Sequence, residues 1–284
     1  MERYSIPHIL NILGVKAFNS PVSLRLRALT GVFPPREIRP RSPLSSISDL
    51  FVWRTGDAWD TGFSLFNQLT HLFPERAEVD RVSFIVFDKF GKVIARKNEE
   101  VPPYKRRFLS ISDVLSGVTH CDFGTVAFFH DVTGIKELPA ARSHLTERGY
   151  IAYRKSSTPV WSYMHGNLQA LCKDPGASSY KFVAGSSSAL MRYRPQLRFD
   201  DCEKFELAYT NPTPRAKRLC VRLFDKDGET VKEIFRKIPS CGAEMIRVDN
   251  SDRRIVMIEG EGRIPMWRPA VFKYAQQSFD VFHG

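Results

Sequence analysis

The most regular hydrophobic pattern of the chain lies in residues 82–94, VSFIVFDKFGKVI, and it returns in residues 219–231, LCVRLFDKDGETV. In each segment, apolar residues fill both faces of an extended strand, and a second alternating stretch follows a Phe-Asp-Lys-x-Gly phrase. The carboxylate of Asp88 can accept hydrogen bonds from nearby backbone amides, and Gly91 can take a positive φ without a Cβ clash. Each segment therefore predicts a β-hairpin closed by a type I turn and a glycine bulge.

Further phrases occur in the same order around both hairpins, which indicates an internal duplication. They are Phe63–Asn67 and Phe205–Asn211 upstream, Val101–Pro102 with Arg107–Asp113 and Ile238–Pro239 with Glu244–Asp249 downstream, and His165–Gly166 and His283–Gly284 at the ends. The first copy is longer than the second, and residues 131–148 are predicted to form the additional loop or short helix.

Short apolar or alternating segments separated by turn residues predict strands throughout residues 46–167 and 187–284. About seven such strands in each copy are typical of a β-sandwich. The sequence therefore predicts an all-β protein of two tandem antiparallel β-sandwiches, one in each of these ranges. Residues 168–186, which are rich in turn residues, are predicted to be a linker. Residues 1–45 are predicted to be a basic N-terminal arm with a short amphipathic helix and a proline-rich segment.

Several phrases of the second copy resemble immunoglobulin-like and fibronectin-type-III-like modules. They are Leu207–Asn211, the strand that leads into Asp225–Gly228, Ile238–Pro239 and Glu244–Val248. The resemblance implies a β-sandwich for both copies, and the chain departs from it in having no Cys-Trp-Cys core. It implies nothing about activity, because such folds carry many unrelated functions.

The chain of 284 residues has a formal net charge of +11 and a pI of about 9.5. This excess of positive charge favours anionic partners, namely nucleic acid, a membrane surface or an acidic glycan, although an ordinary soluble basic protein is an equally good interpretation. Residues 1–45 hold seven Lys and Arg residues against two Glu, so contact with a membrane surface or a partner is one hypothesis for the arm. Packing of the arm against the sandwiches is the favoured alternative, because its charge is not concentrated on one helix face.

The five cysteines form an odd number without Cys-x-x-Cys spacing, so neither a zinc site nor a disulfide framework is predicted. Buried reduced thiols indicate a reducing compartment, and the protein is predicted to be cytoplasmic, with peripheral membrane contact as an extension of that hypothesis. No apolar run is long enough for a transmembrane helix, and the N-terminus lacks a secretory pattern.

An aromatic and acidic cluster near Gly56 and Gly62 predicts a carbohydrate-binding surface, since sugar rings stack on aromatic faces beside carboxylates. The candidate ligand-binding residues are Trp53, Asp57, Trp59 and Asp60, extended by Trp161, Tyr163 and His165 on a later strand. A packed sheet edge with a capping turn is the alternative interpretation of this cluster.

Two histidines, His165 and His283, occupy matching places at the ends of the two copies. A functional interpretation makes each imidazole an acid, a base or a ligand. The structural interpretation, which the duplication favours, is a strand-terminal histidine before a turn glycine.

Motifs for catalysis, phosphate binding or cofactor binding are missing, including Gly-x-Ser-x-Gly, the phosphate loop, the dinucleotide fingerprint and His-Glu-x-x-His. The metal-compatible residues 120–122 and 130–131 lie at opposite ends of a predicted strand, about 30 Å apart, so one ion cannot bind both groups. No metal and no cofactor are therefore predicted. The basic runs 105–107 and 215–218 lack interleaved aromatics and are placed in turns, which leaves nucleic-acid binding as a weaker alternative.

These observations favour a non-catalytic binding protein that contacts carbohydrate or another anionic ligand or partner. The alternative from another class is a carbohydrate-active or hydrolytic enzyme that uses the acids near Trp59 and a histidine. The sequence leaves enzymatic activity open, and convergence of Asp57, Asp60 and a histidine in one pocket would favour the enzyme.

Overall fold

The computed structural model describes most of the chain beyond residue 44. The described residues are 45–75, 77–115, 117, 121–131, 145–147, 150–166, 169–183, 190–264, 267–275 and 278–284, and, before these ranges, Ser20, Val22, Ser23 and Leu26. Most of the predicted basic arm, residues 1–45, and most of the additional loop predicted for residues 131–148 lie outside the described residues.

Strands dominate the described segments between residues 45 and 284, where two one-turn helices also occur, α3 (Gln68–Leu72) and α4 (Ile111–Leu115). The strands up to residue 182 are β1 (Ser46–Asp49), β2 (Phe51–Arg54), β3 (Trp59–Phe66), β4 (Asp80–Asp88), β5 (Val93–Val101), β6 (Arg106–Ser110), β7 (Phe123–Asp131), β8 (Leu145–Glu147), β9 (Tyr150–Lys155), β10 (Ser162–His165), β11 (Gln169–Lys173) and β12 (Lys181–Phe182). The later strands are β13 (Met191–Tyr193), β14 (Lys204–Thr210), β15 (Lys217–Phe224), β16 (Thr230–Ile238), β17 (Ala243–Asp249), β18 (Met257–Gly262), β19 (Ala270–Ala275) and β20 (Ser278–His283). None of the helices in the described residues has the length and apolar character needed to cross a membrane.

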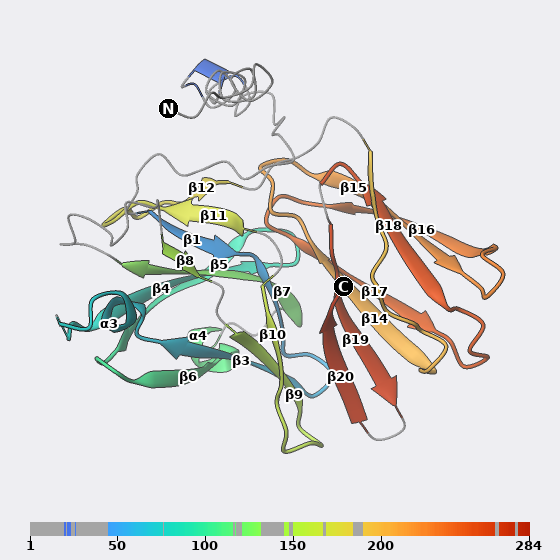
Figure 1. Cartoon of the computed structure of the whole chain (residues 1–284), viewed down its shortest axis with the longest axis horizontal. Helices are drawn as coiled ribbons and strands as arrows, with labels where there is room; N and C mark the ends of the chain where they lie inside the picture. Colours follow the sequence, from blue (N-terminus) through green and yellow to red (C-terminus); the bar gives the residue numbers. More distant parts are fainter. Residues whose placement is uncertain are drawn as a thin grey trace, which may run out of the picture.

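These strands form five four-stranded sheets in the described part of the chain (Figure 1). The sheets, with their strand orders, are sheet I (β12-β11-β1-β8), sheet II (β2-β7-β4-β5), sheet III (β10-β9-β3-β6), sheet IV (β13-β18-β15-β16) and sheet V (β17-β14-β19-β20). Almost all neighbouring strands are antiparallel, and β1 with β8 is a parallel pair.

The all-β character is confirmed, but the prediction of two tandem β-sandwiches of the immunoglobulin or fibronectin type is wrong. The described strands instead make five small sheets in a five-bladed, propeller-like arrangement. The sequence does not predict sheet I, because β1 pairs there with β11 and β8, which lie far along the chain. β11 and its other neighbour β12 lie within residues 168–186, the predicted linker. Alternating patterns identify strands but not their partners, and long-range pairing decides how many sheets form.

Both predicted hairpins are confirmed, as β4 with β5 and β15 with β16. The Asp88 carboxylate accepts hydrogen bonds from the amides two and four residues later, both at 2.9 Å, and Asp225 does the same at 3.0 and 2.9 Å. The glycines that close the turns have positive φ angles, 80° at Gly91 and 82° at Gly228. A register shift follows in each hairpin, as a glycine bulge requires.

The order of strands in sheets II and III recurs in sheets IV and V. Sheet II corresponds strand for strand to sheet IV, and sheet III to sheet V read from β20 to β17. The landmark asparagines also correspond, since Asn67 Nδ2 donates to the Val101 carbonyl and Asn211 Nδ2 to the Ile238 carbonyl, both at 2.9 Å. We call β2–β7 with β9 and β10 the first copy, and β13–β20 the second copy.

Three large hydrophobic clusters lie between sheets that pack face to face. The first fills the space between sheets II and III, and Phe272 and Val281 of sheet V extend it. The second lies between sheets IV and V, and the third between sheets I and II. Sheet V therefore contacts apolar residues on both of its faces, so it joins the second copy to the first.

A buried ion pair also joins the two copies. Arg54 Nη1 on β2 lies 2.6 Å from Glu206 Oε2 on β14, and their side chains are 4% and 3% exposed. The Arg54 guanidinium also lies 4.1 Å from the centroid of the Trp59 ring. Burial by itself would raise the pKa of Glu206, but Arg54, with the Tyr274 hydroxyl and Arg247, lowers that pKa below its usual value.

Candidate functional site: the aromatic face of sheet III

The outward face of sheet III combines exposed aromatic rings with a floor of small side chains. On β3, Phe63 and Leu65 point into the core, so the even-numbered residues of this strand face outward. The register places Ala152 opposite Gly62, and Gly62 opposite Ser110, in one row across three strands. Small residues in the centre of the sheet leave room for a flat ligand or for a ring from a neighbouring strand.

Five aromatic side chains surround this floor, and we call them the aromatic face. They are Phe66, Phe108, Tyr150, Trp161 and Tyr163. Tyr150 is 57% exposed, Tyr163 51% and Phe108 45%, which is high for side chains of this size. Exposed aromatic side chains that gather on one face make that face a candidate interaction site.

Gly62 lets the Phe108 ring lie directly on the sheet. A Cβ added at Gly62 would come 2.1 Å from Phe108 Cζ, so no other residue fits there without displacing the ring. The Phe108 ring then meets Trp161 edge to face, with 4.8 Å between their centroids. This contact fixes two of the aromatic rings relative to each other.

Polar groups order one border of the aromatic face. Arg154 Nη2 lies 3.0 Å from Asp60 Oδ2, and the Ser110 hydroxyl donates to Asp60 Oδ1 at 2.9 Å. The Arg154 guanidinium lies 4.5 Å from the centroid of the Trp161 ring. Together these contacts hold Trp161 in place and present carboxylate, hydroxyl and guanidinium groups beside it.

His165, at the end of β10, meets its counterpart from the second copy. His283 Nε2 lies 3.0 Å from His165 Nδ1, and both nitrogens lie within 3.0 Å of the Gly166 carbonyl oxygen. Burial, then His165, lowers the pKa of His283, and Arg268 lowers it further, whereas the hydrogen bond to Gly166 raises it. The Gly166 carbonyl can accept a hydrogen bond from both of these ring nitrogens, and the pair thus connects the ends of β10 and β20.

Four of the seven candidate residues come together on or beside the aromatic face: Asp60, Trp161, Tyr163 and His165. The other three do not. Trp53 is fully buried and its indole donates to the Phe87 carbonyl at 2.9 Å, while Asp57 is exposed and pairs with Arg247 at 2.8 Å.

Trp59, the third of these residues, is 5% exposed. Its ring packs edge to face on Phe279, with centroids 4.5 Å apart, and on Phe272 at 5.4 Å. Neither face of the Trp53 or Trp59 ring is open to a sugar, because both indoles pack in the hydrophobic core. The carbohydrate prediction therefore rests on Trp161 and Tyr163.

Sequence reasoning did not select Phe66, Phe108 and Tyr150. A partial signal was present, since Phe66 and Tyr150 alternate with buried residues of their strands, Leu65 and Ile151. The three rings come from separate strands, and only the pairing of β3, β6 and β9 brings them together.

The metal-compatible residues do not form a centre. His130 Nδ1 lies 2.6 Å from Asp80 Oδ2 in the core, and Cys121 is at the other end of β7. His120 lies outside the described residues. Within the described ranges, no group of three or more His, Cys, Asp or Glu side chains is placed to hold a metal ion.

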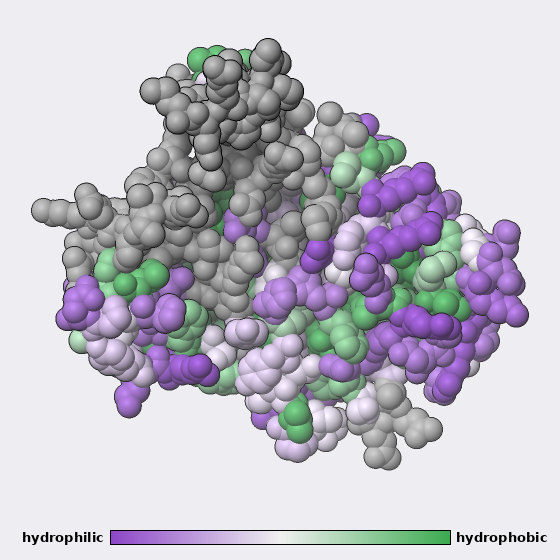
Figure 2. Space-filling model, viewed as in Figure 1, coloured by the Kyte–Doolittle hydropathy of each residue, from purple (hydrophilic) through white to green (hydrophobic). Residues whose placement is uncertain are grey.

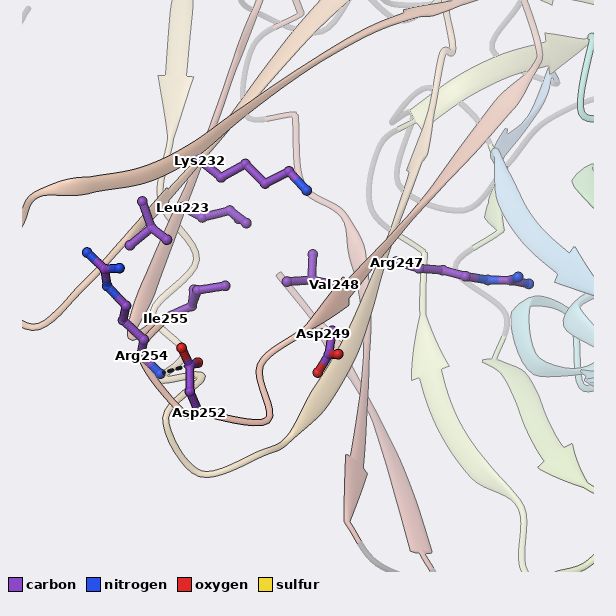
Figure 3. A pocket seen from close by; sticks show the side chains of 9 residues that line it. Leu223, Lys232, Arg247, Val248, Asp249, Asp252, Arg254 and Ile255 are labelled. Carbon is purple, nitrogen blue, oxygen red and sulfur yellow. Dashed lines mark hydrogen bonds between the residues drawn. The ribbon is translucent and has the colours of Figure 1, made fainter.

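Two hollows of the surface lie on the second copy. The smaller, with a volume of about 240 Å³, has a wall of Leu223, Val248 and Ile255, and Arg247 points away from this wall (Figure 3). The larger, of about 530 Å³, lies over β15 and β16. Neither is lined by Asp57, Asp60 or a histidine, and the two acids bind different arginines, so the convergence expected of the enzyme alternative is not found at these hollows.

No family model matches this chain, and no curated protein matches it at a significant level. Among solved structures, it is similar to an isomalto-dextranase of Arthrobacter globiformis T6 complexed with panose, with 14% identity, a TM-score of 0.18 and coverage of 78% of this chain and 35% of that chain. It is also similar to infectious bursal disease virus Gx strain, with 10% identity, a TM-score of 0.14 and coverage of 85% and 56%. A beta-glucuronidase from glycoside hydrolase family 2 has 8% identity, a TM-score of 0.17 and coverage of 83% and 23%. The chain thus spans between about a quarter and somewhat over half of these proteins, and TM-scores this low assign no function.

Proposed function

We propose that this protein is a non-catalytic binding protein whose aromatic face contacts carbohydrate. The observation that carries the proposal is the exposure of several aromatic rings over the small residues of sheet III. The C–H groups of a pyranose ring carry partial positive charge and pack favourably on the electron-rich face of an aromatic ring. Trp161 and Tyr163 would supply such faces.

Polar groups beside the rings suit the hydroxyl groups of a sugar. Asp60 offers carboxylate oxygens, and Arg154 and His165 offer nitrogen donors along the same border. Because Asp60 and Arg154 already bind each other, they form a preorganised pair that needs little ordering when a ligand arrives. The pairing of Asp60 with Arg154 supports recognition of a ligand rather than acid–base catalysis by these side chains.

The proposal also includes a compartment for the protein and a second kind of partner. All five cysteines are free thiols, which supports a reducing compartment such as the cytoplasm. Contact of residues 1–45 with a membrane surface stays part of the proposal for anionic partners.

The proposal is tested by affinity electrophoresis of the full chain in gels that contain a panel of neutral and acidic polysaccharides. We expect retardation by at least one polysaccharide, and a loss of about 2- to 13-fold in affinity for Trp161→Ala and Tyr163→Ala, since each removes a stacking partner worth about 0.5–1.5 kcal/mol. The matched control is Phe90→Ala, which removes a more exposed aromatic ring from the β4–β5 turn and should leave binding unchanged.

Retardation that is equal in all variants, or absent throughout the panel, overturns the carbohydrate proposal. Sedimentation velocity of the same proteins identifies the other occupant of such a face. If the wild type associates with itself and Tyr163→Ser does not, the face binds a second copy of this chain instead.

A further inference from the structure

One end of sheet IV carries an unusual concentration of positive charge. Its six residues, which we call the basic end, are Arg215, Lys217, Arg218, Arg236, Lys237 and Arg263. They gather because β15 begins where β16 and β18 end, so that Arg218 pairs in register with Lys237, and the next residue of β15 with Gly262. The local sequence, which places these cations in three separate runs, does not reveal the cluster.

Part of this charge is not neutralised by carboxylates of the described residues. Arg236 pairs with Glu244 at 2.7 Å, whereas neither Arg218 nor Lys237 forms an ion pair with a carboxylate in the described part of the chain. Burial, followed by repulsion from Arg263 and Arg215, lowers the pKa of Lys217. A set of cations that repel one another in the free protein gains free energy when an anion arrives.

An apolar groove of about 530 Å³ opens beside the basic end on the outward face of sheet IV. Phe235, which is 66% exposed, and Leu190, which is 60% exposed, lie along it with Cys220. Phe235 is two residues from Lys237 on the same face of β16, and therefore about 7 Å from it along the strand. This spacing is comparable with the separation between a nucleobase and its own phosphate.

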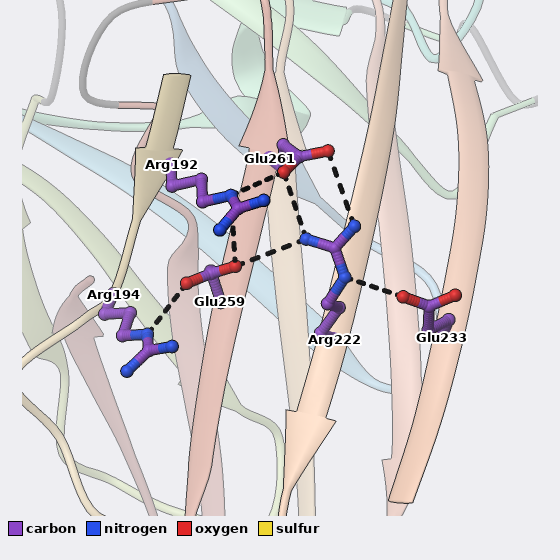
Figure 4. A network of polar contacts seen from close by, with 6 residues as sticks. All are labelled: Arg192, Arg194, Arg222, Glu233, Glu259 and Glu261. Atoms are coloured by element: carbon purple, nitrogen blue, oxygen red, sulfur yellow. Dashed lines mark hydrogen bonds and ion pairs between the residues drawn. The ribbon is translucent and has the colours of Figure 1, made fainter. Parts of the chain in front are cut away.

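The opposite border of the groove is electrically balanced. Arg222 lies 2.6 Å from Glu233, 3.3 Å from Glu259 and 3.1 Å from Glu261, and Arg192 lies 2.6 Å from Glu261 (Figure 4). The carboxylates of this network are thus occupied. In the part of the view that sheet IV occupies in Figure 1, Figure 2 shows hydrophilic side chains around smaller apolar areas. An anionic ligand in the groove meets net positive charge on one side and no free negative charge on the other.

We propose that the groove and the basic end bind single-stranded nucleic acid, with a base stacked on Phe235 and the adjoining phosphates on Arg218 and Lys237. A polyanion without rings, such as a sulfated glycan, would use the cations but not the exposed ring. An acidic peptide would likewise place only carboxylates there. Residues 215–218 were interpreted as a turn without aromatic neighbours, but Lys217 and Arg218 begin β15, and the next strand supplies the ring.

Fluorescence anisotropy of the full chain with a 5′-labelled oligothymidylate of about 12 nucleotides, which suits one binding surface, tests the proposal. Phe235→Ala should lower the affinity about 5- to 100-fold, the range expected for loss of one stacked base. The double variant Arg218→Ala with Lys237→Ala should lower the affinity for the oligonucleotide further. It should also reduce the slope of log Kobs against log[salt] by about 1.4, that is, by about 0.7 for each phosphate contact removed.

Lys226→Ala is the matched control, because it removes an exposed cation from the turn at the far end of the same strands. This variant should leave the affinity and the salt dependence unchanged. Thermal melts confirm that each variant folds. The proposal is overturned if Phe235→Ala binds as tightly as wild type, or if heparin or oligoglutamate competes as well as unlabelled oligothymidylate of equal charge. Trp161→Ala, which changes the aromatic face of sheet III, should bind the oligonucleotide as tightly as the wild type. Failure of the nucleic-acid proposal can therefore be distinguished from failure of the carbohydrate proposal.

Discussion

Replacement of Glu206 by alanine should destabilise the protein more than any change to an exposed ion pair. The Arg54–Glu206 pair is 2.6 Å long and its side chains are 4% and 3% exposed, so the arginine would stay buried without its partner. Charge centres about 4 Å apart attract by about 4 kcal/mol at an effective dielectric constant of about 20. Because that attraction offsets the desolvation of both ions, its removal should cost about 3–5 kcal/mol.

The assay is urea unfolding followed by tryptophan fluorescence, with Glu100→Ala as the control. Glu100 pairs with Arg81, and both side chains are more than 60% exposed, so this control should lose less than about 1 kcal/mol. The double variant Arg54→Met with Glu206→Leu fills the same space without charge and should recover most of the loss. Equal losses for Glu206→Ala and Glu100→Ala would refute the reasoning.

The same pair predicts a dependence on pH. Since the folded protein lowers the pKa of Glu206 from its ordinary value of 4.5, the ionised form is favoured by folding. The difference in stability between wild type and Glu206→Ala should therefore be complete above about pH 4.5 and should shrink as the pH falls through the lower, folded value. A difference that stays constant below pH 4.5 would contradict this.

Two further predictions concern the turns and the histidine pair. Gly91→Ala and Gly228→Ala both force alanine to adopt a positive φ, which should cost about 1–2 kcal/mol of stability in each variant. The new Cβ at position 91 would also lie 1.8 Å from the Ser240 carbonyl oxygen, whereas the new Cβ at position 228 would meet nothing within 4 Å. Urea midpoints should show an extra loss of about 1–3 kcal/mol for Gly91→Ala, and equal losses would contradict the packing argument. In NMR titrations His283 should have a pKa below 6.5, and this pKa should rise in the His165→Ala variant. Because folding favours the neutral form of His283, the stability of the protein should fall as the pH drops from 6.5 through the pKa of the folded state.

The hairpins were predictable because their information is local. Asp88 and Gly91 lie within one turn, and the side-chain and φ requirements of that turn can be read without knowing the rest of the fold. The number of sheets was not predictable in this way. Sheet I depends on β1 pairing with β11, whose residues lie more than a hundred positions later, and no local pattern encodes that partner.

Parity explains which candidate residues lie on the surface and which lie in the core. Trp59 and Asp60 are neighbours in the sequence and looked like one cluster, but successive residues of β3 point to opposite faces, so the indole enters the core and the carboxylate reaches the surface. The same rule, applied to Trp161 and Tyr163, keeps both on the outward face. Choosing the outward parity requires knowledge of which face is covered, and only the assembled sheets provide it.

The duplication gives the strongest reason to regard the aromatic face as a binding surface. In the second copy, the face of sheet V that corresponds to it carries Glu206, Ala208 and Phe272, all no more than 2% exposed, because that face packs against the first copy. In the first copy, the corresponding face of sheet III is left open, with Tyr163 and Phe108 about half exposed. The same sheet surface is therefore closed where the fold uses it and open where it does not, and this difference supports the proposal that the aromatic residues on the open surface contact a ligand.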